Sequence, residues 1–311
     1  AFSSGTAALH GACYAAGISD GDEVITSPLT FVASANCVLY QGGIPVFADI
    51  RSDTYNLSPK EVEAKITEKT KAIIPVHFAG QPAELDELKA LAEAHQLILI
   101  EDGAHALGAA YKNKKIGSIG EMTMFSFHPV KPITTGEGGV ITTNHRDYYE
   151  KLLQFRSHGI TRDPNKLPAD PGPWYYEMQH LGYNYRLTDI QAALGLSQLR
   201  KLESYNDRRK QIAMSYHKAL GAMPELILPK LADEVESSWH IYVIRLNLQL
   251  LTVGRKEIFQ ALQAENIGVN VHYIPVHTQP FYRQLGYKRN LCPNAERIYE
   301  ELITLPLHPG M

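Results

Sequence analysis

Two side chains near the ends of predicted strands could act together on one small aromatic aldehyde. Asp102 directly follows the predicted strand 97–101, and Lys131 comes shortly after the predicted strand 122–127. Parallel strands of an open α/β sheet place their ligands at one edge, so both side chains are expected there. A desolvated lysine amine can attack an aldehyde, and an aspartate can keep a pyridine nitrogen protonated. The pair therefore indicates chemistry with pyridoxal phosphate (PLP).

Polar residues close to this pair in the sequence support the same interpretation. His105 follows Asp102 by three positions, and Ser126 supplies a hydroxyl shortly before Lys131. Ser4-Gly5-Thr6 opens a predicted helix, whose first N–H groups suit a phosphate. Each feature alone has a simpler explanation, because such an aspartate is often a helix cap, a lone lysine is usually solvated, and Ser-Gly-Thr is an ordinary N-cap. Together they favour a cofactor site.

Alternating strand and helix patterns from Gly5 to about Thr143 predict a mostly parallel sheet. Gly, Pro, Asp and Ser residues separate the segments, as βαβ units require. The strand candidates are 23–26, 45–50, 71–78, 97–101, 122–127 and 140–143. The helix candidates between them are 6–16, 31–39, 59–66 and 85–95. We expect these segments to form most of a large α/β domain that covers residues 1–210.

The rest of the chain predicts a long loop, a helical connection and a smaller domain. Residues 160–185 are rich in Pro, Gly and aromatic residues and show no clear period, which indicates a long surface loop. Apolar positions at helical spacing over 188–220 predict one long helix or two joined helices. The segments that follow predict a small α+β domain of residues 211–311, with strands at 240–246 and 268–273 and helices at 255–265 and from about 294.

Composition excludes several classes of protein. The chain has 311 residues, of which 44% are hydrophobic, and a formal net charge of −3, so it predicts a globular fold and no nucleic-acid partner. No apolar run approaches the length of a membrane span. Three cysteines without metal-like spacing predict a reducing, cytoplasmic location and no metal site. Because the sequence opens at Ala1 without Met and stops at Met311, we expect both ends to be truncated.

Short motifs are spread over essentially the whole chain. They are Ser4-Gly5-Thr6, Thr30-Phe31-Val32-Ala33, Glu101-Asp102 with His105, Ser126-Phe127-His128-Pro129-Val130-Lys131, Glu137-Gly138-Gly139 and Gly182-Tyr183-Asn184-Tyr185-Arg186. Together they resemble the DegT/DnrJ/EryC1/StrS sugar aminotransferase family. The resemblance implies the type I fold of PLP-dependent transferases, in which a mostly parallel seven-stranded sheet flanked by helices is joined to a small C-terminal α+β domain. It also implies a homodimer whose subunits share their active sites.

Carried over by position, the resemblance assigns the cofactor contacts. Lys131 would form the Schiff base, Asp102 would face the pyridine nitrogen, and His105 would lie near the ring and its phenolic oxygen. Phe31 would stack on the ring. The phosphate would be held by the backbone and hydroxyl groups of Gly5 and Thr6 and by Ser126. Asn184 would reach it from the partner subunit.

The resemblance also predicts the reaction. The family's substrates are nucleotide-linked keto sugars, usually with glutamate as the amino donor. The run 128–135 with Glu137-Gly138-Gly139 resembles the pseudaminic-acid branch of the family. Enzymes of this branch are of the UDP-4-amino-4,6-dideoxy-N-acetyl-β-L-altrosamine transaminase type. They aminate C4 of a UDP-linked 4-keto-6-deoxy-N-acetylhexosamine. Candidate substrate contacts, for which packing or solvent exposure is the alternative, are Tyr185, Arg186, His272, Tyr273 and His277.

Other functions stay open at this point. Some family members carry histidine at the Schiff-base position and are dehydratases, whereas Lys131 favours transamination. The substrate could be another UDP- or dTDP-linked keto sugar, or an amino acid. A non-catalytic PLP-binding regulator on the same fold would ordinarily carry a DNA-binding module, and the sequence shows no basic helix-turn-helix pattern.

Overall fold

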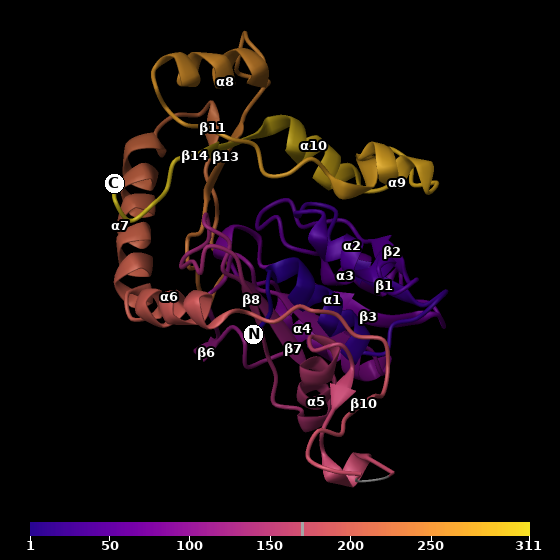
Figure 1. Cartoon of the computed structure of the whole chain (residues 1–311). Coiled ribbons are helices and arrows are strands. Elements are labelled where there is room, and N and C mark those ends of the chain that lie inside the picture. Colours follow the sequence, from indigo (N-terminus) through magenta and orange to yellow (C-terminus); the bar gives the residue numbers. More distant parts are fainter. Residues whose placement is uncertain (169–170) are drawn as a thin grey trace.

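The central sheet contains six strands among residues 1–168 and 171–311, the part of the chain that the computed structural model describes (Figure 1). In spatial order they are β2 (Ile44–Phe47), β1 (Glu23–Thr26), β3 (Thr70–Ile74), β4 (Ile98–Asp102), β7 (Met122–Ser126) and β8 (Gly139–Thr142). Neighbouring strands run parallel except β7 and β8, which are antiparallel. The predicted mostly parallel α/β sheet is therefore confirmed.

The expectation of a seventh strand in this sheet is wrong for the described residues. Beyond β8, Phe2 forms only an isolated antiparallel bridge with Gly139, in which each residue's N–H donates to the other's carbonyl at 2.7 and 2.9 Å. The next residue, Ser3, donates its N–H to the Tyr185 carbonyl instead. The chain thus leaves the sheet after one residue pair, because Ser4 already caps the first helix.

Helices cover both faces of the sheet, so its strands are almost continuously apolar. In β3, Ile73 packs into one core while its neighbours Ala72 and Ile74 pack into the other. One core is closed by α1 (Gly5–Ala15), α2 (Ala33–Leu39) and α5 (Arg146–Phe155). The other is closed by α3 (Pro59–Glu63) and α4 (Leu85–Ala94). Helix α5 was not predicted, since only Leu152 and Phe155 in its polar sequence are fully buried.

The segment after α5 is irregular, as predicted, apart from short elements. These are β9 (Ile160–Thr161), paired antiparallel with β10 (Glu177–Met178), and the 3-10 turn η2 (Pro164–Lys166). Residues 169–170 of the predicted loop lie outside the described residues. The helical pattern over 188–220 forms two joined helices, α6 (Asp189–Leu199) and α7 (Leu202–Leu220), which meet at a sharp bend in Figure 1.

The C-terminal part is a small antiparallel sheet with helices. Its strands are β11 (Leu226–Ile227), β13 (Tyr242–Leu246) and β14 (Leu302–Leu305), with β13 between the other two. Its helices are α8 (Arg255–Ala264), α9 (Pro280–Gln284) and α10 (Pro293–Glu301), with the turn η3 (Val276–Thr278). The remaining short elements are η1 (Phe78–Gly80), β5 (Ala110–Tyr111), β6 (Lys114–Lys115) and β12 (Val235–Glu236).

The predicted strand over 268–273 is wrong. Only Asn270 pairs with β14, through two hydrogen bonds to Thr304. In the antiparallel register, Gly268 would stand opposite Pro306, which has no N–H to donate. The pairing therefore stops after one bridge, and the next residues turn toward the large sheet.

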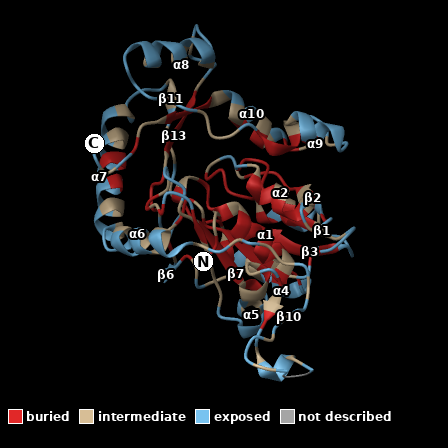
Figure 2. Ribbon diagram, viewed as in Figure 1, coloured by how far each residue is buried: buried red, intermediate tan, exposed pale blue. Residues whose placement is uncertain are grey.

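Burial is concentrated around the central sheet, α1 and α2, whereas α6 and α8 are largely exposed (Figure 2). A third core joins the two parts of the chain, because Phe47 and Phe78 pack with Tyr282, Ile298 and neighbouring side chains. The domain limits 1–210 and 211–311 stay a prediction. No helix in the described part of the chain combines the length and apolar character that crossing a membrane requires.

Candidate active site

A cavity of about 560 Å³ lies where the sheet edge meets the start of α1. Strands β4 and β7 are neighbours, so the loops that follow them enter this cavity side by side. The cavity gathers most of the residues that the sequence singled out, namely Gly5, Thr6, Phe31, Asp102, His105, Ser126, Lys131, His272 and Tyr273. The amine of Lys131 and the carboxylate of Asp102 therefore belong to one site.

Asp102 is held in place from the floor of the cavity. Its side chain is 5% exposed and accepts hydrogen bonds from Ser34 Oγ at 2.6 Å and from the Ala104 N–H at 3.0 Å. The Ser34 hydroxyl also lies 2.8 Å from Thr30 Oγ1. Sequence reasoning missed Ser34, because a serine in a short, largely apolar helix gives no signal. Its hydroxyl fixes the orientation of the carboxylate.

Lys131 lies in the loop after β7, where its N–H donates to the His128 carbonyl at 2.9 Å. Its side chain is half-buried. Burial lowers the pKa of the Lys131 amine to about 8, and the attraction of Asp102, which works in the opposite direction, does not offset this. At pH 7 an amine of this pKa is neutral in about one molecule in ten, against about one in 2,500 for an ordinary lysine. Lys131 is therefore suited to attack an aldehyde and to accept a proton.

This lowered pKa predicts how Lys131 reacts in cofactor-free protein. Acetylation of Lys131 by acetic anhydride is expected to rise with pH around a midpoint near 8, because only the neutral amine reacts. At pH 7 its neutral fraction should exceed that of an ordinary lysine by about 250-fold. Peptide mass spectrometry at a series of pH values measures this, with exposed Lys69 as the internal comparison. A midpoint above 10 for Lys131 would contradict the assigned environment.

His105 forms the wall beside Lys131 and is 4% exposed. Its Nε2 lies 3.1 Å from the Tyr273 hydroxyl, and its ring centroid lies 4.3 Å from that of His240. Burial lowers the pKa of His105 well below its ordinary value, and the nearby charge of Lys131 lowers it further. The ring is therefore neutral. Its buried Nδ1 has no hydrogen-bond partner in the described part of the chain, so a polar atom of a bound group can satisfy it.

The start of α1 forms the opposite end of the cavity. Ser4 caps the helix by accepting a hydrogen bond from the Ala7 N–H at 3.0 Å. The first N–H groups of a helix have no partner inside it, which makes this end suitable for an anion. A Cβ atom on Gly5 would lie 2.9 Å from the Cβ of Ser126, so only glycine allows the two segments to approach this closely. The Ser126 hydroxyl thereby meets the helix start.

Four predicted contacts lie away from this cavity in the single chain. Asn184 and Arg186 are exposed, and the Tyr185 hydroxyl lies 3.4 Å from His10 Nδ1. His277 has no exposed surface and its Nε2 lies 2.9 Å from a Glu296 carboxylate oxygen. The prediction that His277 contacts substrate is wrong, because a ring that is enclosed in a core and held through Nε2 by Glu296 cannot reach one.

The cavity fits pyridoxal phosphate. It offers an amine for the aldehyde, a buried carboxylate for the pyridine nitrogen and an unpaired imidazole nitrogen at His105. The helix start and Ser126 suit the phosphate, and Phe31 presents a ring that is 58% exposed. A doubly covered α/β sheet with these groups at its edge defines the class of PLP-dependent enzymes.

The chain belongs to the DegT/DnrJ/EryC1/StrS aminotransferase family, whose model matches residues 1–311. It is 44% identical over 313 residues to the spore coat polysaccharide biosynthesis protein SpsC of Bacillus subtilis, covering all of this chain and 80% of SpsC. PseC of Helicobacter pylori, an aminotransferase involved in the biosynthesis of pseudoaminic acid, matches with a TM-score of 0.90 at 37% identity, over 99% of this chain and 81% of PseC.

A further solved structure shows the cofactor in a relative. Spr1654 of Streptococcus pneumoniae in its PLP form matches with a TM-score of 0.90 at 33% identity, over 100% of this chain and 82% of Spr1654. Family and fold thus agree with the class that the cavity defines. The protein is a PLP-dependent aminotransferase of type I fold.

Proposed function

We propose that the protein transfers an amino group from glutamate to C4 of a UDP-linked 4-keto-6-deoxy-N-acetylhexosamine. The observation that carries the transferase part is the shared cavity of Lys131 and Asp102. The likeness to PseC, with the motif over 128–135, supports the sugar. The 44% identity to SpsC supports a second candidate, a different UDP- or dTDP-linked keto sugar that is used for a surface polysaccharide.

Each cavity residue then has a separate task. Lys131 would hold the cofactor's aldehyde carbon and, once displaced by the donor amine, carry a proton from the donor's Cα. Asp102 would keep the pyridine nitrogen protonated, with Ser34 fixing its carboxylate. Neutral His105 would form a hydrogen bond with the cofactor's phenolic oxygen, and Phe31 would cover the cofactor ring. The bound cofactor supplies an electron sink for the charge that leaves the Cα–H bond.

The sugar end of the site would be formed by His272 and Tyr273, which line the same cavity from the C-terminal part of the chain. Burial lowers the pKa of His272 to about 4, so its ring is neutral. Its Nδ1 lies 2.9 Å from Thr304 Oγ1. Burial raises the pKa of the Tyr273 hydroxyl well above its usual value, so it stays protonated as a donor. Neutral donors and acceptors of this kind suit the hydroxyl groups of a sugar.

A turnover screen of UDP- and dTDP-linked 4-keto sugars with glutamate tests this proposal. Mass spectrometry should find a product in which the C4 carbonyl has become an amine, together with 2-oxoglutarate. Preference for a dTDP-linked sugar would select the second candidate. A dehydrated, nitrogen-free sugar would select a dehydratase, and amino exchange between amino acids alone would select an amino-acid transaminase. Bound PLP without any turnover would favour a regulator.

We also propose a homodimer in which Asn184 of one subunit reaches the phosphate end of the other's cavity. Helix α6 has no buried residue, and large apolar side chains are exposed on it and on the preceding loop. They include Trp174 (71%), Met178 (65%), Leu181 (73%), Ile190 (85%) and Leu196 (65%). Asn184, in the segment that leads into α6, is exposed and lies outside its own cavity. The cytoplasmic location of the protein also stays a prediction.

Changing Ile190 to glutamate is expected to weaken the dimer, because a charge would replace an apolar contact at the interface. Sedimentation velocity should show dissociation at protein concentrations at least about tenfold higher than for wild type. Cofactor affinity should fall in parallel, since each site would lose its partner residue. The exposed lysine of α8, changed as Lys256→Glu, is the control. A dimer of unchanged strength would place the interface elsewhere.

A further inference from the structure

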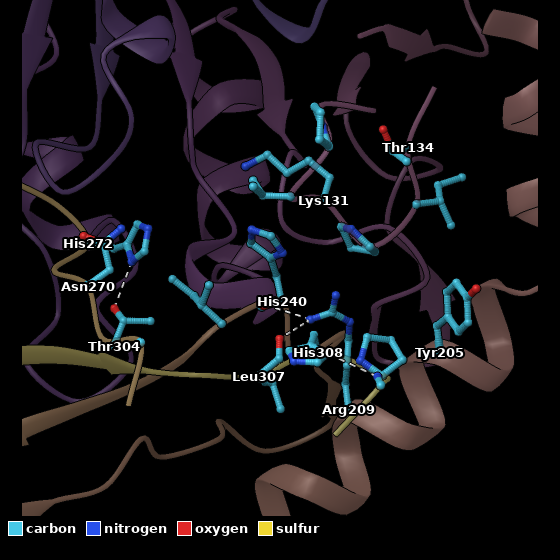
Figure 3. A pocket seen from close by; sticks show the side chains of 18 of the residues that line it. Lys131, Thr134, Tyr205, Arg209, His240, Asn270, His272, Thr304, Leu307 and His308 are labelled. Atoms are coloured by element: carbon cyan, nitrogen blue, oxygen red, sulfur yellow. Dashed lines mark hydrogen bonds between the residues drawn. The ribbon is translucent and has the colours of Figure 1, made fainter. Parts of the chain in front are cut away.

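A second cavity, of about 880 Å³, adjoins the cofactor cavity. It lies between the Lys131 loop, α7 and the C-terminal segment that follows β14 (Figure 3). The two cavities share four lining residues, Val130, Lys131, His272 and Tyr273. The two cavities therefore meet at the loop that carries Lys131.

Arg209 of α7 lines this cavity and is only 5% exposed. Its Nη1 donates to the carbonyls of His240 and Leu307 at 3.0 and 2.9 Å. Its Nε is buried without a partner, and no carboxylate in the described part of the chain lies within ion-pair distance of the guanidinium. Figure 3 shows the side chain extending from α7 toward His240, on the side that faces the Lys131 loop. A buried, unpaired cation is costly unless an anion joins it.

The rest of the lining strengthens this imbalance of charge. The lining of this cavity contains one lysine, Lys131, and one arginine, Arg209, but no aspartate or glutamate. Burial keeps His240 and His272 neutral, because it lowers the pKa of both rings. It also lowers the pKa of Arg209, to about 10, so the guanidinium is still charged at neutral pH. Apart from Lys131, which would hold the cofactor, the cavity thus carries one fixed positive charge, in a lining of neutral polar and apolar residues.

We propose that Arg209 receives a carboxylate of the amino donor while the donor's amine reaches the cofactor carbon that Lys131 would hold. A guanidinium fork matches one carboxylate through parallel hydrogen bonds. The diphosphate of a nucleotide sugar carries more than one charge, whereas Arg209 is the single fixed cation of this cavity beyond the lysine that holds the cofactor. The inference rests on the proposed transamination but not on which sugar is aminated.

The test measures binding of glutarate, a dicarboxylate that has no amine to transfer, by titration calorimetry of the holoenzyme. Arg209→Gln is expected to weaken glutarate binding by about 30-fold or more, because the buried partner of the charge is lost. Arg209→Lys, which keeps the charge, should retain most of the affinity. The neighbouring Arg208 is exposed on the same helix and does not line the cavity. Arg208→Gln should therefore bind glutarate like wild type.

The two half-reactions, followed through the cofactor's absorbance, identify the bound group. Arg209→Gln should raise the glutamate concentration needed for the donor half-reaction by a similar factor and leave the keto-sugar half-reaction unchanged. Impairment of the sugar half-reaction alone would assign Arg209 to the diphosphate and overturn the proposal. Unchanged glutarate binding would overturn it as well.

A second variant covers the case in which Arg209→Gln does not fold. Asn270 is exposed on the wall of the same cavity, and Asn270→Asp adds a negative charge there with little change in shape. Glutarate binding should weaken in this variant, and unchanged affinity would count against an anion in the cavity. If wild type binds glutarate through Arg209 but aminates no sugar, the sugar assignment fails and the anion site stands. If wild type aminates sugar yet Arg209→Gln binds glutarate normally, only the anion site fails.

Discussion

Replacing Lys131 by alanine is expected to abolish amino transfer, with a loss of turnover of at least about 1,000-fold. The variant would lose both the amine that holds the cofactor and the base that carries the donor's proton. No other lysine lines the cofactor cavity in the described part of the chain, so no side chain there can take over either task. The visible absorbance of the purified protein should disappear together with activity.

Turnover of glutamate and the absorbance spectrum of the purified variant measure this effect. Lys131→Arg is the matched variant, because arginine keeps a positive charge in the cavity but cannot form the bond to an aldehyde. It should be as inactive as Lys131→Ala. Lys115→Ala, in an exposed strand, should behave like wild type. Activity that survives in Lys131→Ala would require a different catalytic lysine and would refute the site.

Replacing Asp102 by asparagine is expected to slow turnover by about 100-fold or more while most of the cofactor stays bound. Asparagine has the same shape and can still meet the Ser34 hydroxyl, which lies 2.6 Å from the carboxylate in wild type. It carries no charge, however, so the pyridine nitrogen would lose its stabilised proton and the ring would withdraw electrons less strongly. The loss should therefore fall on kcat.

Single-turnover kinetics of the glutamate half-reaction separate this loss from weaker binding. Ser34→Ala is the graded comparison, because it removes the hydroxyl that positions the carboxylate but keeps the charge. Its rate should fall by about tenfold or less. If Asp102→Asn instead lost its cofactor and kept its kcat when resupplied, Asp102 would have a structural role only.

Much of the large sheet could be predicted from sequence because its physical signal is local. Both faces of the sheet are covered, so strands such as β3 and β4 are runs of apolar residues bounded by polar ones. Asp102 and Ser126 end two such runs, and neighbouring parallel strands bring their ends together. For this reason the main site residues could be grouped from the order of residues alone.

Other features could not be predicted because they depend on contacts between distant segments. The hydrogen bond from Ser34 to Asp102 joins residues 68 positions apart, and neither residue's sequence neighbours indicate the other. The strand predicted at 268–273 had suitable residues but lacked a partner beyond Asn270. His277 has the same side chain as a catalytic histidine, and only its burial beside Glu296 shows that it is structural.

The sequence also could not connect Arg209 with the site. Its pattern is that of an ordinary polar position in a long helix, and 78 residues separate it from Lys131. Only the fold places it on a cavity that Lys131 also lines. The partner-subunit role of Asn184 is a different case, because a single chain contains only one half of the proposed contact.

Reduction of the purified protein with borohydride, followed by peptide mass spectrometry, tests the central claim most directly. Borohydride locks the cofactor onto the lysine that carries it. We expect the mass of the reduced pyridoxyl group on the peptide that contains Lys131, and on no peptide from the Lys131→Arg variant. The group on another lysine, or on none in protein that turns over glutamate, would contradict the account.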